Sequence, residues 1–384
     1  MHAFARLGLI AGTALAASTA LAAPALATTT GPSHTGWGYP GTSSAVFVQT
    51  DNPAGNQVEV YQRATDGTLS LLQGYATGGL GGVLDGSVVD HQASQGSLTY
   101  DSAHHLLYAL NAGSNTVSVF AVNGTSLTLR QTIASGGVFP VSVAVHGNVV
   151  YVLNAENGGN IQGYRVEHGR LVSKASWNRP LGLDAQATPQ FTHTPGQVGF
   201  TANGSQLLVT TKAANNSVYV YRLGLDGAPA ASPTVNSLPG TVPFAFVTTG
   251  WHQIALVEVG TSSVVTFEVN NDGTLTQRSA LATGQAATCW IARSGDLLFA
   301  SNAGSATETG ARLGFGGTLT DLGRTSTDAG AVDAVASLDG RNLYVQTGGS
   351  GNVDEYQIDA SGTLTRIGSV TVPGAVGGEG IAVN

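Results

Sequence analysis

Lys212, Glu258 and His193 are the residues whose side-chain types could carry out catalysis in this chain. Lysine is rare here, since Lys174 and Lys212 are the only two in 384 residues. A carboxylate held close to a lysine in a partly buried setting can activate water and stabilise the oxyanion that forms during ester hydrolysis. Two simpler interpretations stay open. Lys212 and Glu258 could form an ion pair between neighbouring repeats, and His193 could be a surface histidine.

Six further residues are predicted to contact a ligand because they stand in loops next to apolar strands. They are Asp51, Asn111, Glu156, Trp290, Asn302 and Asp333. Asparagines at strand ends often cap loops instead, and tryptophans often pack in the core, so these alternatives also remain. The adjacent His104 and His105 have no third and fourth ligand at a suitable spacing for a metal. The sequence leaves metal ions and cofactors unknown.

The chain lacks the short motifs of several common enzyme classes. It has no Gly-x-Ser-x-Gly nucleophile turn, His-Glu-x-x-His helix, phosphate-binding loop or dinucleotide fingerprint. Its formal charge of −8, from 15 basic and 23 acidic residues, disfavours binding to nucleic acid or to an anionic membrane surface. Cys289 is the single cysteine, so no disulfide can form within the chain.

A turn phrase that recurs seven times predicts the elements that position these residues. Its glycine stands at residues 67, 124, 169, 227, 273, 317 and 362, so successive copies are 44 to 58 residues apart. This period is expected when one small β-sheet is repeated around an axis. Apolar strands flank a polar loop within each repeat, as in residues 106–110 and 117–120. The prediction is an all-β, seven-bladed β-propeller of four-stranded antiparallel blades.

The two ends of the chain are predicted to close this ring. Six repeats have an inner strand before their second strand, whereas none precedes residues 45–48. An unmatched copy of the inner strand, residues 380–383, ends the chain. We therefore expect the C-terminal strand to pair with the N-terminal blade, which leaves no open sheet edge.

The first 27 residues are predicted to be a cleaved secretory signal. They have a weakly basic start, an apolar run over residues 7–21 and a small-residue exit at Ala25-Leu26-Ala27. The run is too short and alanine-rich to anchor the chain in a membrane, so we expect a secreted protein without a membrane span. Residues 28–44, rich in Thr, Gly, Pro and Ser, are predicted to be a flexible lead-in, and residues 45–384 the propeller.

Several longer phrases give the chain a family resemblance. The most specific are Leu208-Val209-Thr210-Thr211-Lys212, Pro243-Phe244-Ala245-Phe246 and Gln285-Ala286-Ala287-Thr288-Cys289-Trp290. With the repeated turn, they make residues 45–384 resemble a secreted branch of the seven-bladed lactonase-like propellers, a family that includes sugar-lactone hydrolases and carboxymuconate cycloisomerases. The resemblance implies the propeller fold and hydrolysis of a small cyclic ester, a lactone.

The expected active-site pattern of that family is matched only in part. Members thought to act on lactones carry a histidine phrase before the fourth inner strand, an aspartate loop after its second strand, and arginines from neighbouring blades. The corresponding phrases here are Thr194-Pro195-Gly196-Gln197 and Lys212-Ala213-Ala214-Asn215, and Pro243-Phe244 opens the fifth inner strand without an Arg-His pair. Glu258 stands where the family often has a glutamate.

Two functions are therefore expected. The first is a secreted lactonase-like hydrolase that acts at the channel mouth, with Glu258 as the base and Lys212 or loop amides as oxyanion donors. The second is a non-catalytic extracellular propeller that binds a small molecule, a glycan or a protein partner on its loop face. A small molecule or glycan at the channel mouth is the expected ligand. The chain is expected to be a monomer that does not bind nucleic acid.

Overall fold

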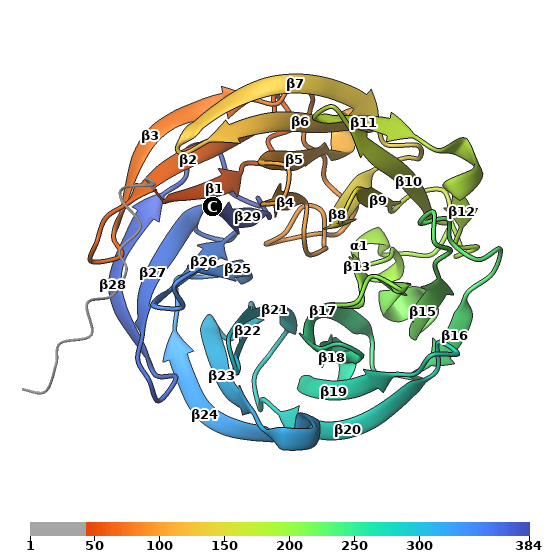
Figure 1. Ribbon diagram of the computed structural model, residues 1–384. Coiled ribbons are helices and arrows are strands. Elements are labelled where there is room, and N and C mark those ends of the chain that lie inside the picture. The colour runs from red at the N-terminus through yellow and green to blue at the C-terminus, as the bar shows by residue number, and fades with distance from the viewer. Residues whose placement is uncertain (1–43) are drawn as a thin grey trace, which may run out of the picture. The chain divides into compact units, whose positions relative to one another are not determined.

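Seven β-sheets surround a central axis in the computed structural model, which describes residues 44–384 (Figure 1). The predicted signal, residues 1–27, and all of the predicted lead-in except Ser44 lie outside the described residues. Each sheet is one blade of four antiparallel strands, and the third blade carries one added short strand. The predicted seven-bladed β-propeller is confirmed.

The blades follow one another along the chain. Blades 1 to 3 consist of β29 (Ile381–Val383), β1 (Ala45–Gln49), β2 (Gln57–Arg63) and β3 (Leu69–Ala76); β4 (Leu98–Asp101), β5 (Leu106–Asn111), β6 (Thr116–Asn123) and β7 (Ser126–Ala134); and β8 (Pro140–His146), β9 (Val149–Asn154), β10 (Asn160–Glu167), β11 (Arg170–Ser173) and β12 (Arg179–Pro180). Blades 4 and 5 consist of β13 (Val198–Phe200), β14 (Gln206–Thr210), β15 (Ser217–Arg222) and β16 (Thr234–Ser237); and β17 (Pro243–Gly250), β18 (Gln253–Glu258), β19 (Ser263–Val269) and β20 (Leu275–Ala282). Blades 6 and 7 consist of β21 (Thr288–Ser294), β22 (Leu297–Asn302), β23 (Thr307–Leu313) and β24 (Leu319–Ser326); and β25 (Ala331–Ala336), β26 (Asn342–Thr347), β27 (Asn352–Ile358) and β28 (Leu364–Thr371).

Helix is nearly absent from the described residues. It comprises one α-helical turn and five 3-10 turns: α1 (Gln190–His193), η1 (Ala112–Ser114), η2 (Ala175–Trp177), η3 (Lys212–Ala214), η4 (Val259–Thr261) and η5 (Phe315–Gly317). Within residues 44–384, no helix has the length and apolar character needed to cross a membrane.

Apolar side chains fill the space between neighbouring blades. The second strand of a blade is buried on both faces, as in β5 and β22, whereas the outer strands alternate between exposed and partly buried residues. Tyr108 and Val119 of blade 2, for example, belong to one cluster with Val143 and Val152 of blade 3. Each blade is therefore stabilised mainly by burying both of its faces against its neighbours.

The recurring turn also joins neighbouring blades. Gly67 adopts φ +94°, which favours glycine, and its carbonyl oxygen accepts a hydrogen bond of 2.8 Å from the Tyr344 hydroxyl of blade 7. The carbonyl oxygen of Gly227 accepts an equivalent bond of 2.7 Å from Tyr151 in the preceding blade. The repeat therefore specifies both a turn and the contact that attaches it to the preceding blade.

The ends of the chain close the ring as predicted. β29 pairs with β1 in antiparallel register, with Phe47 opposite Ala382 and Val48 opposite Ile381. The Asn384 side chain adds a bond of 2.8 Å from the backbone N–H of Ala45 to its Oδ1. The two strands lie side by side at the inner edge of blade 1 (Figure 1).

Candidate functional site

A loop crosses the central channel near one of its ends. Residues 88–97, here called the plug, belong to the connection between β3 of blade 1 and β4 of blade 2, yet they contact blades 4 and 6. The Gln95 side chain pairs with the backbone of Ile291, donating to its carbonyl at 3.0 Å and accepting from its N–H at 2.9 Å. Trp290 Nε1 donates to the Ser94 carbonyl at 2.6 Å. These bonds hold the plug on the face where the loops after the second strands lie.

Four carboxyl groups are buried beside the plug: Asp51, Asp90, Asp333 and Glu379. Asp51 accepts hydrogen bonds from the Glu379 backbone N–H at 2.7 Å and from Gln92 Nε2 at 2.5 Å. Asp90 accepts from the backbone N–H groups of Gln92 and Ser94 at 2.8 and 2.9 Å. The hydrogen-bond donors to these two carboxyl groups are therefore amide N–H groups, and not positively charged side chains.

Burial makes these groups weak acids. Desolvation raises the pKa of Asp51 to about 8, that of Asp333 to about 7 and that of Asp90 to about 6. It also raises the pKa of Glu379 well above its ordinary value, and the neighbouring Asp333, Asp90 and Asp51 carboxylates raise it further. Some of these carboxyl groups therefore keep a proton near neutral pH.

Lys212 is the buried cation of this region. Its side chain leaves η3, and its Nζ donates to the carbonyl oxygens of Ala93 and Phe191 at 2.7 and 2.6 Å and to Thr194 Oγ1 at 3.0 Å. Desolvation lowers the pKa of Lys212 to about 7, and the Asp90 carboxylate opposes that shift. All three donors of an ammonium group are used, so Lys212 joins the plug to the segment that contains α1.

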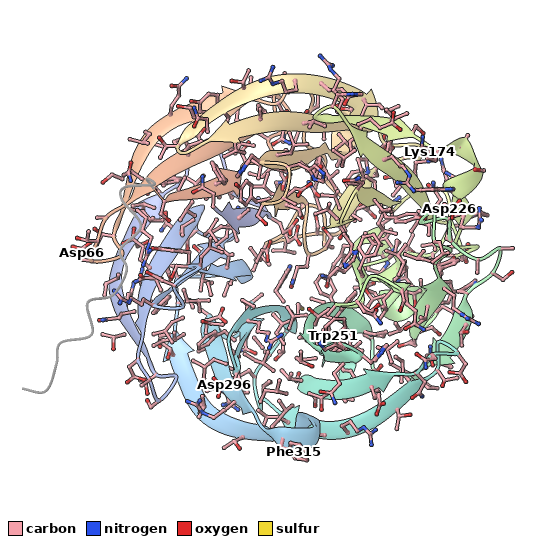
Figure 2. The ribbon with its side chains drawn as sticks, in the orientation of Figure 1. Asp66, Lys174, Asp226, Trp251, Asp296 and Phe315 are labelled. Carbon is pink, nitrogen blue, oxygen red and sulfur yellow. The ribbon has the colours of Figure 1, made fainter. Side chains whose placement is uncertain are left out.

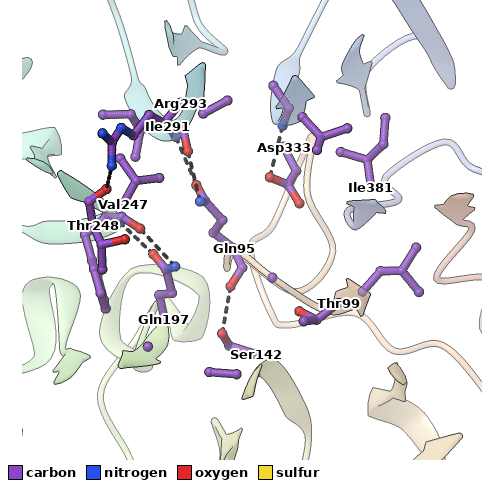
Figure 3. A pocket seen from close by; sticks show the side chains of 18 of the residues that line it. Gln95, Thr99, Ser142, Gln197, Val247, Thr248, Ile291, Arg293, Asp333 and Ile381 are labelled. Carbon is purple, nitrogen blue, oxygen red and sulfur yellow. Dashed lines mark hydrogen bonds between the residues drawn. The ribbon is translucent and has the colours of Figure 1, made fainter. Parts of the chain in front are cut away.

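The other end of the channel holds an open cavity of about 810 Å³. The inner strands form its wall, and Figure 3 shows the side chains that point into it or along it. The cavity extends to the end of β21, where Arg293 and Gly295 line it and Arg293 is exposed. The plug residue Gln95 lies at its closed end.

Several polar groups of this wall connect adjacent blades. Gln197 of blade 4 accepts from the backbone N–H of Phe246 in blade 5 at 2.6 Å and donates to its carbonyl at 3.1 Å. Ser142 Oγ donates to the Gln95 carbonyl at 2.7 Å. Arg293 Nη1 donates to the Thr248 carbonyl at 2.6 Å (Figure 3). Much of the hydrogen-bonding capacity of the wall is therefore used within the protein.

Asp333 is the ionisable group that connects the buried carboxyl groups with the open cavity. It lines the cavity, is 5% exposed, and accepts a hydrogen bond of 3.0 Å from the Ala334 N–H (Figure 3). The buried carboxyl group of Glu379 is a close neighbour, and the charge of Asp333 raises the pKa of Glu379. Two neighbouring buried carboxyl groups do not easily ionise together, so one of them can act as an acid or a base close to neutral pH.

The two charged residues that were expected to act together have different hydrogen-bond partners. Glu258 Oε2 accepts from Thr261 Oγ1 at 3.3 Å, and desolvation raises the pKa of Glu258. Within residues 44–384, no ion pair joins Glu258 to Lys212. The alternative of an ion pair between repeats is therefore not supported, and the catalytic roles of both residues stay predictions.

His193 lies with Glu156 at a small pocket of about 20 Å³. The imidazole Nδ1 is 2.9 Å from Thr192 Oγ1 and 3.1 Å from the Pro189 carbonyl oxygen. Lys212 does not line this pocket, although Thr194, which it contacts, does. The structure thus gives His193 a neighbour in Glu156 that the sequence did not suggest.

Asn111 and Asn302 have equivalent places in blades 2 and 6. Asn111 Nδ2 donates to Thr116 Oγ1 at 3.0 Å and to Ser118 Oγ at 2.8 Å. Asn302 Nδ2 donates to Thr309 Oγ1 at 2.9 Å. These bonds connect each loop to its own blade, as expected for capping, and the predicted contact of both residues with a ligand stays a prediction.

Sequence reasoning missed Asp90, Gln95 and Arg293. Asp90 and Gln95 lie in an irregular connection with no strand periodicity, and Arg293 looked like an ordinary residue of an inner strand. One signal was available, because the recurring glycines at 67 and 124 are 57 residues apart and those at 169 and 227 are 58 apart, against 44 to 46 elsewhere. The two longer intervals contain the plug and the α1 segment, which Lys212 joins.

Metal binding was left open by the sequence. Among the residues described, 44–384, no three His, Cys, Asp or Glu side chains are grouped so that they could hold a metal ion.

Comparisons with known proteins agree with the fold. The model of the family described as Lactonase, 7-bladed beta-propeller, matches residues 29–177 and 86–377. No curated protein gives a significant sequence match. Among solved structures, a candidate 6-phosphogluconolactonase from Bacteroides fragilis has 18% identity and a TM-score of 0.71, covering 92% of this chain and 100% of that one. The periplasmic gluconolactonase PpgL from Pseudomonas aeruginosa has 16% identity and a TM-score of 0.68, covering 88% and 98%. At these identities the two structures support the fold alone.

Proposed function

The chain belongs to the lactonase family of seven-bladed β-propellers, and from this premise we propose that it is a secreted hydrolase of small lactones. The observation that carries the proposal is the placement of Asp333, which lies on the wall of an 810 Å³ cavity and has the buried carboxyl group of Glu379 as a neighbour. Desolvation raises its pKa to about 7, which suits a group that exchanges protons near neutral pH.

In the proposed reaction, Asp333 is the general base. Its ionised carboxylate accepts a proton from water while the water oxygen attacks the carbonyl carbon of the lactone. The ring C–O bond then breaks and the departing oxygen takes the proton, so that lactone and water give a hydroxy acid. Glu379 positions Asp333 and keeps its own proton while Asp333 is ionised, because the two carboxyl groups cannot easily ionise so close together.

The cavity favours a polar substrate that carries a negative group. Its wall mixes backbone and side-chain polar groups with Val, Ile and Ala, which suits the edges and faces of a sugar ring. Arg293 is exposed where the cavity opens, so its guanidinium can attract a carboxylate or phosphate on the substrate. We therefore propose acidic or phosphorylated sugar lactones as the first substrates to test.

The decisive experiment compares three variants on one panel of sugar and aromatic-acid lactones, with acid release measured above the background rate. D333N is expected to lower kcat about 100-fold or more, while the isosteric amide keeps the fold. E258Q and H193A, which alter the catalytic candidates on the loop face, are expected to retain most of the activity. Activity of the unmodified protein should rise with pH through about 7, because only the ionised Asp333 is a base.

Two results would change this assignment. If E258Q is inactive and D333N is active, the reaction belongs to the loop face, with Glu258, His193 and Lys212 in the roles expected from the sequence. If no lactone is hydrolysed, with or without added divalent metal, the enzymatic proposal fails.

The second candidate is a non-catalytic propeller that binds a glycan. Trp251, labelled in Figure 2, favours it, because this side chain is 75% exposed in the turn between β17 and β18, and the β17 residues Val247 and Thr248 just before this turn line the cavity. An exposed indole is a suitable surface for stacking against a sugar ring. Binding to immobilised glycans that is lost in W251A, together with no acid release, would support this function.

Secretion is part of the proposal and rests on residues 1–27. Expression of the full chain in a bacterial host should yield a mature protein outside the cytoplasm whose N-terminus begins near residue 28. N-terminal sequencing of the purified protein tests this, and an intact N-terminus in a cytoplasmic protein would contradict it.

A further inference from the structure

A second pocket lies on the loop face, on the other side of the plug from the open cavity. Its volume is about 160 Å³, and its wall combines plug residues with loops of blades 4, 5 and 6. The principal apolar side chains are Val88, Ala93, Phe244, Val259 and Trp290. The pocket shares no residue with the open channel cavity, so it is a separate site.

The polar groups at this pocket are already bound within the protein. Lys212 has three acceptors for its three donors, and both Asp90 carboxyl oxygens accept backbone N–H groups. Thr192 Oγ1 donates to the Pro189 carbonyl at 3.1 Å. Desolvation raises the pKa of Cys289 to about 12, so its thiol remains neutral. A charged ligand would therefore lose its hydration without gaining a partner.

The apolar wall is shaped to receive a ring. Phe244 and Trp290 pack edge to face, with centroids 5.2 Å apart and planes at 73°. The Lys212 ammonium lies 5.6 Å from the Phe244 ring centroid, a cation–π contact that helps to hold that ring in place. An apolar cavity of about 150 Å³ is large enough to hold benzene, so this pocket has room for a single six-membered ring with a small substituent.

We propose that this pocket binds a small, neutral aromatic or alicyclic molecule. The ligand would contact the plug directly through Val88 and Ala93. The carbonyl of Ala93 is the acceptor for Lys212, and the carbonyl of the next residue, Ser94, is the acceptor for Trp290. Binding at this pocket therefore stabilises the plug in its position across the channel and the folded state, as any ligand of the native state does.

The experiment uses toluene as the neutral probe and benzoate as its charged counterpart, with the purified mature protein. Toluene is expected to bind in calorimetry and to raise the midpoint of thermal unfolding, whereas benzoate has no effect at equal concentration. V259F fills the pocket and should weaken toluene binding about tenfold or more. V235F is the matched control, because Val235 is 53% exposed on β16 and does not line the pocket.

Crystals soaked with iodobenzene locate the site without any substitution, since iodine gives a strong anomalous signal. An iodine position between Phe244 and the plug supports the proposal. The proposal fails if toluene does not bind, if benzoate binds equally well, if V259F binds as tightly as V235F, or if iodine occupies the channel cavity instead.

Discussion

The two ends of the channel are built from the same seven blades but differ in the exposure of their charged side chains. At the plugged end, Lys212 is 2% exposed and donates to three fixed acceptors, and the carboxyl groups receive backbone and side-chain amides. At the open end, Arg293 is exposed and lines a cavity that a solute can enter. Charged groups at the plugged end therefore stabilise the fold, whereas charged groups at the open end are accessible to a ligand.

Asp333 lies at the boundary between the two regions. Its carboxyl group raises the pKa of the fully buried Glu379, and it also lines the open cavity. Lys212 is occupied by three fixed acceptors whereas Asp333 lies at the edge of a cavity, and for this reason the proposed function assigns the base to Asp333.

Removing residues 377–384 is expected to have the largest effect on stability, because it takes away β29 together with Glu379. The truncation is expected to reduce the free energy of unfolding by about 5 kcal/mol or more, since it exposes the inner edge of blade 1 and frees the plug amides of Gly96 and Ser97. Urea denaturation measures the loss. E379Q keeps the strand, so it separates the role of the carboxyl group from that of ring closure. An unchanged unfolding midpoint would show that the closing strand is dispensable.

The two lysines allow a direct comparison of buried and exposed cations. K212M leaves the carbonyl oxygens of Ala93 and Phe191 without their donor and Asp90 without its cation, so we expect a loss of about 3 kcal/mol. Lys174 lies at the outer part of the ring and contacts Glu167 at 3.1 Å, with its side chain 32% exposed (Figure 2). K174M should change the stability by no more than about 0.5 kcal/mol. Equal losses in urea denaturation would contradict the structural role of Lys212.

A smaller effect is expected when pH is changed. Asp51, Asp90, Asp333 and Glu379 have higher pKa values in the folded chain than in the unfolded chain, so folding takes up protons. Their contribution to stability is complete at low pH and is lost as pH rises from about 5 toward about 8. An average uptake of one proton over two pH units corresponds to about 2.7 kcal/mol. Urea denaturation at pH 5, 6.5 and 8 tests the sign, and a stability that rises over this range would refute it.

Glu308 provides the smallest change and a control outside the channel. It is fully buried in blade 6, near Asp354 of blade 7, and desolvation raises its pKa to about 8. E308Q replaces the buried carboxyl group with a neutral amide, which removes the cost of burying an acid that is ionised in the unfolded chain at pH 8. It should therefore stabilise the protein by about 1 to 2 kcal/mol at pH 8 and have little effect at pH 5. A shallower pH dependence of stability in E308Q would assign part of the slope to Glu308. If E308Q and the unmodified protein are equally stable at pH 5 and also at pH 8, Glu308 does not contribute to the pH dependence.

Much of the fold could be predicted from local chemistry. The seven glycine turns recur because each needs a residue that tolerates a positive φ, as Gly67 does, and strand alternation marks the elements between them. The unmatched strand at residues 381–383 was recognisable because the first repeat lacked its inner strand, and its pairing with β1 followed.

The site was less accessible to such reasoning. Repeat position placed Asp51 and Asp333 near the axis, and both lie among the buried carboxyl groups. It also suggested that Lys212 and Glu258 would act together, whereas their hydrogen bonds go to different partners. Equivalent positions in successive blades share a height along the axis, but side-chain direction depends on the loops that pack between them.

The number of blades, the turns and the closure of the ring follow from the amino-acid sequence, because each depends on residues close in the chain or on a repeated pattern. The position of residues 88–97 across the channel, and their connection through Lys212 to the α1 segment, are apparent only in the folded chain. The Lys212–Ala93 and Gln95–Ile291 contacts connect residues more than 100 positions apart through single side chains. Such contacts have no period, and burial together with neighbouring charges determines which groups keep a proton and which remain open to a ligand.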